Sequence, residues 1–73
     1  MKNKLTLWYD EEADYLELTF KKSKDSYFNE LQKDCFEIKE TTTDEIIGFA
    51  IFNFTHRKEK FLDIPFSLPP RTI

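Results

Sequence analysis

The sequence is short of the residues that hold small proteins together through covalent bonds or metals. One cysteine, Cys35, and one histidine, His56, occur among its 73 residues. A single cysteine excludes a disulfide within the chain, and these two residues are too few for a usual zinc site. We therefore expect no metal and no other cofactor. Because so short a chain buries little apolar surface alone, we expect association with a second subunit instead.

Long hydrophobic runs and a strong charge of one sign are also absent. No apolar segment approaches the roughly 20 residues that span a membrane, and the first residues show no signal-peptide pattern. A free thiol without an export signal favours a cytoplasmic protein. The net charge of −3 opposes non-specific attraction to nucleic acid, since that affinity depends on neutralising phosphates.

Aromatic residues are abundant by comparison. The chain contains eight phenylalanines, three tyrosines and one tryptophan. Each large ring that is removed from water contributes roughly 2–3 kcal/mol. The rings, rather than aliphatic side chains, must therefore supply most of the core.

Alternation of apolar and polar residues predicts a mainly β protein. The segments with period two are 5–9, 15–20 and 35–40, and the apolar segment 46–54 reads as a further strand. Segment 27–31 reads either as a short extended piece or as a helical turn. We expect an antiparallel β-meander of four strands, with the tail as the candidate fifth strand, and at most one short helix. Residues 1–56 would form this sheet domain, and residues 57–73 an extended, proline-containing C-terminal arm.

Segment 46–54 is apolar on both of its faces. Ile47, Phe49 and Ile51 alternate with a second set of apolar side chains. A half-exposed strand does not have this pattern, so we expect both faces of this strand to be covered. The only glycine, Gly48, lies within the segment, which predicts a β-bulge or a close backbone contact.

The C-terminal arm carries apolar residues at period two among prolines. Prolines cannot donate hydrogen bonds to a sheet, so the arm reads as an edge strand or an extended segment. It either folds back on its own sheet or reaches another subunit or protein, and we favour the second use because the chain is so small. The candidate partner-binding residues are Phe61, Leu62, Ile64, Phe66 and Leu68.

The first hairpin has a recognisable motif. Tyr9-Asp10-Glu11-Glu12-Ala13-Asp14-Tyr15-Leu16, followed by Leu18 and Phe20, resembles the YDxEADxLYIxF pattern of a family of small bacterial proteins, domain of unknown function 2283. The resemblance covers roughly residues 5–54, through the loop, the strand 35–40, the acidic turn and Gly48 to Phe52. Ala50 stands where the family usually has Glu, and Glu17 where it usually has Tyr.

The resemblance implies a partner-binding protein rather than an enzyme. The family carries no established enzymatic activity, and its members are often encoded beside small toxin-like proteins. We therefore expect a non-catalytic protein-binding module that is an antitoxin-like partner of a small toxin, acts through the arm, and forms a homodimer. No catalytic residues are predicted.

Two alternatives remain open for the function. A nucleic-acid-binding module would use the basic segment after the last sheet strand, with Arg57, Lys58 and Lys60 contacting phosphates. A purely structural homodimer would need no further partner. The first would bind nucleic acid with a steep dependence on salt, because released counterions set that slope.

Single polar residues give weaker indications. Asp10 is expected to accept hydrogen bonds from the backbone of the acidic turn, while the turn's other carboxylates stay in water rather than bind a cation. Cys35 is expected to be a structural thiol, because Asp34 and Phe36 beside it would not stabilise a thiolate. His56 is expected to matter little, since the chain has no second histidine for acid–base chemistry.

Overall fold

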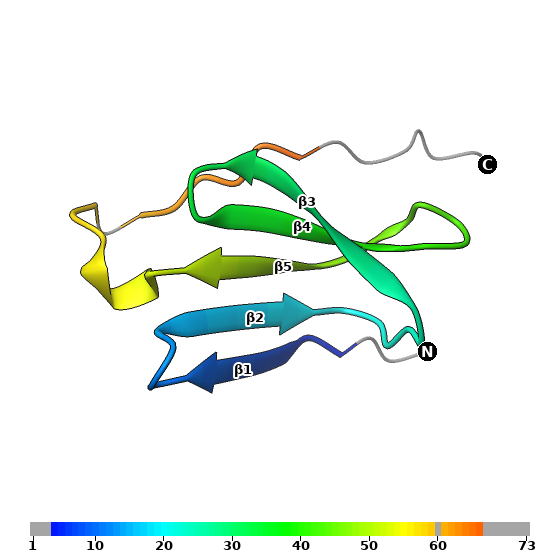
Figure 1. Ribbon diagram of the computed structural model, residues 1–73, viewed down its shortest axis with the longest axis horizontal. Coiled ribbons are helices and arrows are strands. Elements are labelled where there is room, and N and C mark those ends of the chain that lie inside the picture. Colours follow the sequence, from blue (N-terminus) through cyan, green and yellow to red (C-terminus); the bar gives the residue numbers. More distant parts are fainter. Residues whose placement is uncertain (1–3, 60, 67–73) are drawn as a thin grey trace.

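The protein forms one five-stranded antiparallel sheet followed by a single 3₁₀ turn (Figure 1). This computed structural model describes residues 4–59 and 61–66. The elements are β1 (Thr6–Asp10), β2 (Tyr15–Thr19), β3 (Ser26–Gln32), β4 (Cys35–Glu40), β5 (Ile46–Phe52) and η1 (Phe54–His56). The prediction of a mainly β protein with at most one short helix is confirmed. In the described part of the chain, no helix has the length and apolar character needed to span a membrane.

The strands do not follow one another in space as they do in the sequence. Their order is β1-β2-β5-β4-β3, and all four neighbouring pairs are antiparallel. Strands β3, β4 and β5 are joined by consecutive hairpins, and β5 then pairs with the earlier strand β2. This is the arrangement of a Greek key. The result differs from a simple meander because β5 lies at the centre, where its two apolar faces are both screened.

The fifth strand is β3. Segment 27–31, which the sequence left open between an extended piece and a helical turn, lies within β3 and pairs with β4. Residues 61–66 of the arm form no strand. One physical reason is Pro65, which has no N–H to donate to a ladder.

Aspartate and asparagine take the left-handed backbone positions that glycine often fills. Asp14, Asp34, Asp44 and Asn53 have φ values of 52°, 63°, 63° and 54°. Their short polar side chains tolerate this region better than those of other residues. A chain with one glycine can therefore still make the tight turns of this sheet.

Gly48 has a different role, which confirms the expectation of a close backbone contact. A Cβ atom at this position would lie 2.2 Å from the carbonyl oxygen of Leu18 and 2.9 Å from Cγ2 of Thr19. The register between β4 and β5 also shifts beside it, between Ile38 and Lys39. Only glycine lets β2 approach β5 so closely at this point.

The two faces of the sheet are covered in different ways. On one, which we call the arm face, Leu16, Cys35 and Ile51 form a buried cluster against which Leu62 and Ile64 of the arm pack. Figure 1 shows the arm returning from η1 along the sheet, beside β3 and β4.

The opposite face, which we call the aromatic face, is covered mainly by its own rings. Its buried cluster contains Ile38 and Ala50, and Tyr15 and Phe36 pack against them. The half-buried rings thus replace the covering segment that the arm face has.

Candidate functional site

Asp14 joins the first hairpin to the 3₁₀ turn. Its carboxylate accepts hydrogen bonds from the Tyr9 hydroxyl at 2.8 Å, and from the backbone N–H and hydroxyl of Thr55 at 3.0 Å and 2.9 Å. Nδ1 of His56 lies 2.5 Å from its other oxygen. The backbone N–H of Phe54 donates to the Asp14 carbonyl. The prediction that this carboxylate stays in water is wrong, because Asp14 is buried.

The electrostatics of Asp14 follow from these donors. Burial raises the pKa of its carboxyl group, but hydrogen bonds from His56, Thr55 and Tyr9 outweigh burial and hold it well below the ordinary value of 3.8. The hydrogen bond that the Tyr9 hydroxyl donates to Asp14 in turn raises the pKa of Tyr9, because ionisation would remove this bond and place a phenolate beside a carboxylate. All these donors are occupied in holding η1 against the hairpin, so the group acts as a structural joint.

Asp10 lies where the sequence places it. Its Oδ1 accepts hydrogen bonds from the backbone N–H groups of Glu12 and Ala13 at 3.1 Å and 3.4 Å. Glu11 and Glu12 are exposed. Across residues 4–59 and 61–66, no group of three or more histidine, cysteine or acidic side chains is arranged to hold a metal ion.

Cys35 is a buried thiol beneath the arm. Its side chain belongs to the cluster with Leu16 and Ile51, and burial raises its pKa above the ordinary value. A raised pKa leaves the group in its less reactive protonated form, as expected for a structural cysteine.

The candidate partner-binding residues of the arm are divided among different environments. Leu62 and Ile64 pack on the protein's own sheet, and the ring of Phe66 lies 5.1 Å from that of Phe49. Phe61 is 84% exposed, and Leu68 lies outside the described residues. Use of the arm by another molecule stays a prediction, and in this conformation Leu62 and Ile64 are already occupied.

Of the basic residues proposed for nucleic-acid binding, Arg57 is engaged within the chain. The Arg57 guanidinium donates to the Phe61 carbonyl oxygen at 2.9 Å, which fixes the start of the arm. Lys58 is exposed, and Lys60 lies outside the described residues.

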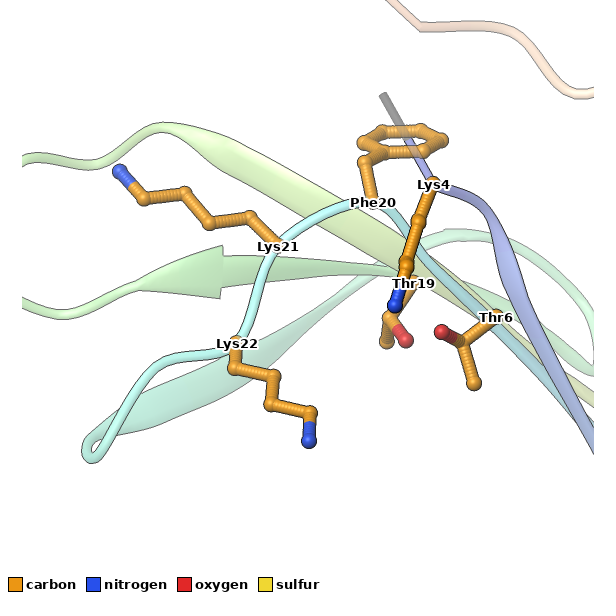
Figure 2. A pocket seen from close by; sticks show the side chains of 6 residues that line it. All are labelled: Lys4, Thr6, Thr19, Phe20, Lys21 and Lys22. Carbon is orange, nitrogen blue, oxygen red and sulfur yellow. The ribbon is translucent and has the colours of Figure 1, made fainter. Parts of the chain in front are cut away.

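A second basic region surrounds a shallow open hollow of about 210 Å³ near the end of β2 (Figure 2). It is lined by Lys4, Thr6, Thr19, Phe20, Lys21 and Lys22. Figure 2 shows Lys4 pointing toward the two threonines, whereas Lys21 and Lys22 extend in other directions. Lys21 also pairs with Glu45 at 3.4 Å. The three ammonium groups therefore do not converge on a common point.

The aromatic face carries an extended arrangement of aromatic side chains. One ring from each strand, taken in spatial order, forms a continuous row across the sheet. The row runs Trp8, Tyr15, Phe52, Phe36, Phe28, with centroid separations of 5.7, 4.9, 5.4 and 6.1 Å. The two end rings are the most open, with Trp8 52% and Phe28 46% exposed. We call this set the aromatic row.

Carboxylates lie beside the rings of this row. Residues that are directly opposite on neighbouring antiparallel strands share a face of the sheet. The opposed pairs are Glu17 with Trp8, Asp10 with Tyr15, and Glu30 with Phe36. The hydroxyl of Tyr15 donates to Glu17 at 2.7 Å. Burial, together with this carboxylate, raises the pKa of Tyr15 above its ordinary value, so the phenol remains a donor.

The arrangement is suited to cationic side chains. Aromatic faces attract Lys and Arg through their quadrupoles, and the neighbouring carboxylates add direct charge attraction. The same carboxylates would repel phosphate groups. The sequence does not reveal the row, because the row depends on a strand order that no local pattern indicates.

Comparison with protein-family models, curated proteins and solved structures finds no match for this chain. The resemblance of the first hairpin to the bacterial family named above therefore stays a prediction.

Proposed function

We propose that the protein is a non-catalytic protein-binding module whose aromatic face binds an extended segment of a partner rich in arginine or lysine. The observation that carries the proposal is the aromatic row with Asp10, Glu17 and Glu30 beside its rings. A row that crosses all five strands offers several such contacts in line.

The expected strength comes from repetition of modest contacts. A cation over an exposed ring contributes about 0.5–1 kcal/mol, and a solvent-exposed ion pair up to about 1 kcal/mol. One basic side chain would therefore bind only weakly. A segment that places successive cations over Trp8, Phe36 and Phe28 can bind usefully, and arginine is favoured because its planar group also stacks.

This proposal keeps the protein-binding class that the sequence predicts but moves the binding surface. The arm is less favoured as the contact, since Leu62 and Ile64 pack on the sheet. An antitoxin-like role, with a basic small toxin as the partner, is one form of the proposed function. Nucleic acid is disfavoured as the ligand because three carboxylates share the proposed surface.

Trp8 provides a direct test, because it is the only tryptophan and lies at one end of the row. Titration with a synthetic peptide of alternating arginine and leucine should shift and saturate its fluorescence, with affinity that falls as salt increases. A peptide with glutamate in place of arginine should not bind. Equal binding of both peptides, or of neither, would contradict the proposal.

Charge-matched variants locate the binding surface. Glu17→Gln and Glu30→Gln should each weaken binding of the arginine peptide by several-fold, since each removes a carboxylate beside a ring. Glu11→Gln and Glu12→Gln remove the same charge from the exposed turn and should have little effect. Phe61→Ala tests the arm, and a loss of binding in that variant alone would favour the arm as the contact surface.

A further inference from the structure

The two edges of the sheet differ in how well they are protected. Leu7 and Tyr9 of β1, with Leu5 just before it, lie toward the arm face, whereas Trp8 lies on the aromatic face. All four side chains are exposed, and Leu7 is 63% exposed. In the part of the chain that the structure describes, no strand pairs with the outer edge of β1. An open, apolar edge of this kind is a template for pairing with another strand.

The edge formed by β3 is protected by the usual devices. A register irregularity between Glu30 and Gln32 interrupts its regular pairing. The Gln32 side chain also donates to the carbonyl of Asp63, which ties the arm to this edge. Bulges, charged side chains and covering segments all oppose further pairing. A strand of another molecule can therefore be added at the edge formed by β1 more easily than at the edge formed by β3.

We propose that β1 pairs with β1 of a second copy of this chain, antiparallel and with Leu7 opposite Leu7. The edge is complementary to itself in this register. Lys4 then faces Asp10 of the second copy, Leu5 faces Tyr9, and Thr6 faces Trp8. Two ion pairs close the ends of the contact, while apolar pairs fill its centre.

Other registers lack this complementarity. A shift of one residue would place the apolar set of one copy against the polar set of the other. A shift of two residues places Lys4 opposite Trp8 in one direction, or Asp10 opposite Thr6 in the other, and both ion pairs are lost. The register centred on Leu7 works with either kind of antiparallel pair, hydrogen-bonded or not.

The dimer would join the two aromatic rows. Because opposed residues share a face, Trp8 of each copy lies on the aromatic face next to the shared boundary. The rows then continue from one sheet into the other, which doubles the surface available to a partner. Since each edge is short, the contact is smaller than a standard interface and its dimer should be weak and concentration-dependent.

Charge exchange at the ends of β1 tests the register. Sedimentation equilibrium should show that the native chain forms dimers. The dissociation constant of the dimer should rise at least tenfold in Lys4→Glu and in Asp10→Lys, because each variant places like charges opposite each other at both ends of the contact. An equimolar mixture of the two variants should regain dimers, since each carboxylate then faces an ammonium group of the other chain. A mixture that stays monomeric while both variants are folded would overturn the proposed pairing.

Asp10 also accepts hydrogen bonds within its turn, so a second test avoids it. Leu7→Cys places two thiols at the symmetry axis, at a separation that suits a disulfide. Mild oxidation should link this variant into a covalent dimer at least tenfold faster than Phe61→Cys, a control on the arm at a position that is even more exposed. The buried Cys35 should remain unlinked. Equal rates for the two variants would overturn the inference.

The dimer and the proposed function fail independently. Self-association is measured without peptide, and peptide binding is measured at concentrations where the chain is monomeric. A chain that stays monomeric but still binds the arginine peptide would contradict only the proposed dimer. A chain that forms the dimer but does not bind the peptide would contradict only the proposed function.

Discussion

The arm face and the aromatic face of this sheet shield their apolar side chains from water in different ways. On the arm face, an aliphatic cluster and Cys35 are covered by a segment from the end of the chain. On the aromatic face, half-buried rings cover one another and remain partly open to water. A small protein can thus keep one face for stability and leave the other as a surface for binding.

Neighbouring residues of β5 test this difference most strongly, because Ile51 faces the arm and Phe52 the aromatic row. Ile51→Ala should destabilise the protein by about 2–5 kcal/mol, the range for a fully buried aliphatic side chain. Phe52→Ala should cost less, about 1–2 kcal/mol, since its ring is only partly removed from water. Urea unfolding of both variants measures the difference. A larger loss in Phe52→Ala would reverse the roles of the two faces.

Gly48 holds the strands that support both faces. Gly48→Ala should destabilise the protein by about 1–3 kcal/mol, because the new methyl group would meet the Leu18 carbonyl and the strands would have to move apart. Ala13→Ser, at an exposed position in the first turn, is a control that makes a change of similar size without that backbone collision. Thermal unfolding gives both values, and an unchanged midpoint for Gly48→Ala would disprove the close approach.

The arm should control access to Cys35. Ile64→Ala is expected to speed the reaction of this thiol with a soluble disulfide reagent about tenfold, because the cover then opens more often. Phe28→Ala, on the aromatic face, should leave the rate unchanged. If both variants react at the native rate, the arm is not the cover of this cluster.

Acid should weaken the joint between the hairpin and η1. The pKa of Asp14 is lowered in the folded protein, so its contribution to stability is complete above its ordinary value of 3.8 and is lost as the pH falls from there through the folded pKa. Asp14→Asn should therefore lose less stability than the native chain between pH 5 and pH 2. Hydrogen bonds from Thr43 and Ser23 also lower the pKa of Glu40. Both proteins should therefore keep a smaller loss of stability with falling pH that comes from this group.

Local patterns predicted most of the strands but not how they are arranged. Alternation identified β1, β2 and β4, the apolar run 46–54 identified β5, and Gly48 indicated the close contact. Segment 27–31 was ambiguous because its propensity is weak, and its pairing with β4 decided that it is a strand.

The candidate site was less accessible to sequence reasoning. Trp8 and Phe28 lie at opposite edges of the sheet, so only the strand order shows that they end one row. Asp14 could not be distinguished from the other acidic residues of its turn, because its donors on Thr55 and His56 come from η1, about 40 residues later. Long-range placement, rather than residue type, determines both features.

Backbone and side-chain NMR shifts during titration with the arginine–leucine peptide test the central claim most directly. The account predicts that the largest shifts occur at the Trp8 indole and the rings of Phe36 and Phe28, while Leu62 and Ile64 change little. Shifts confined to the arm, with the aromatic row unaffected, would contradict it.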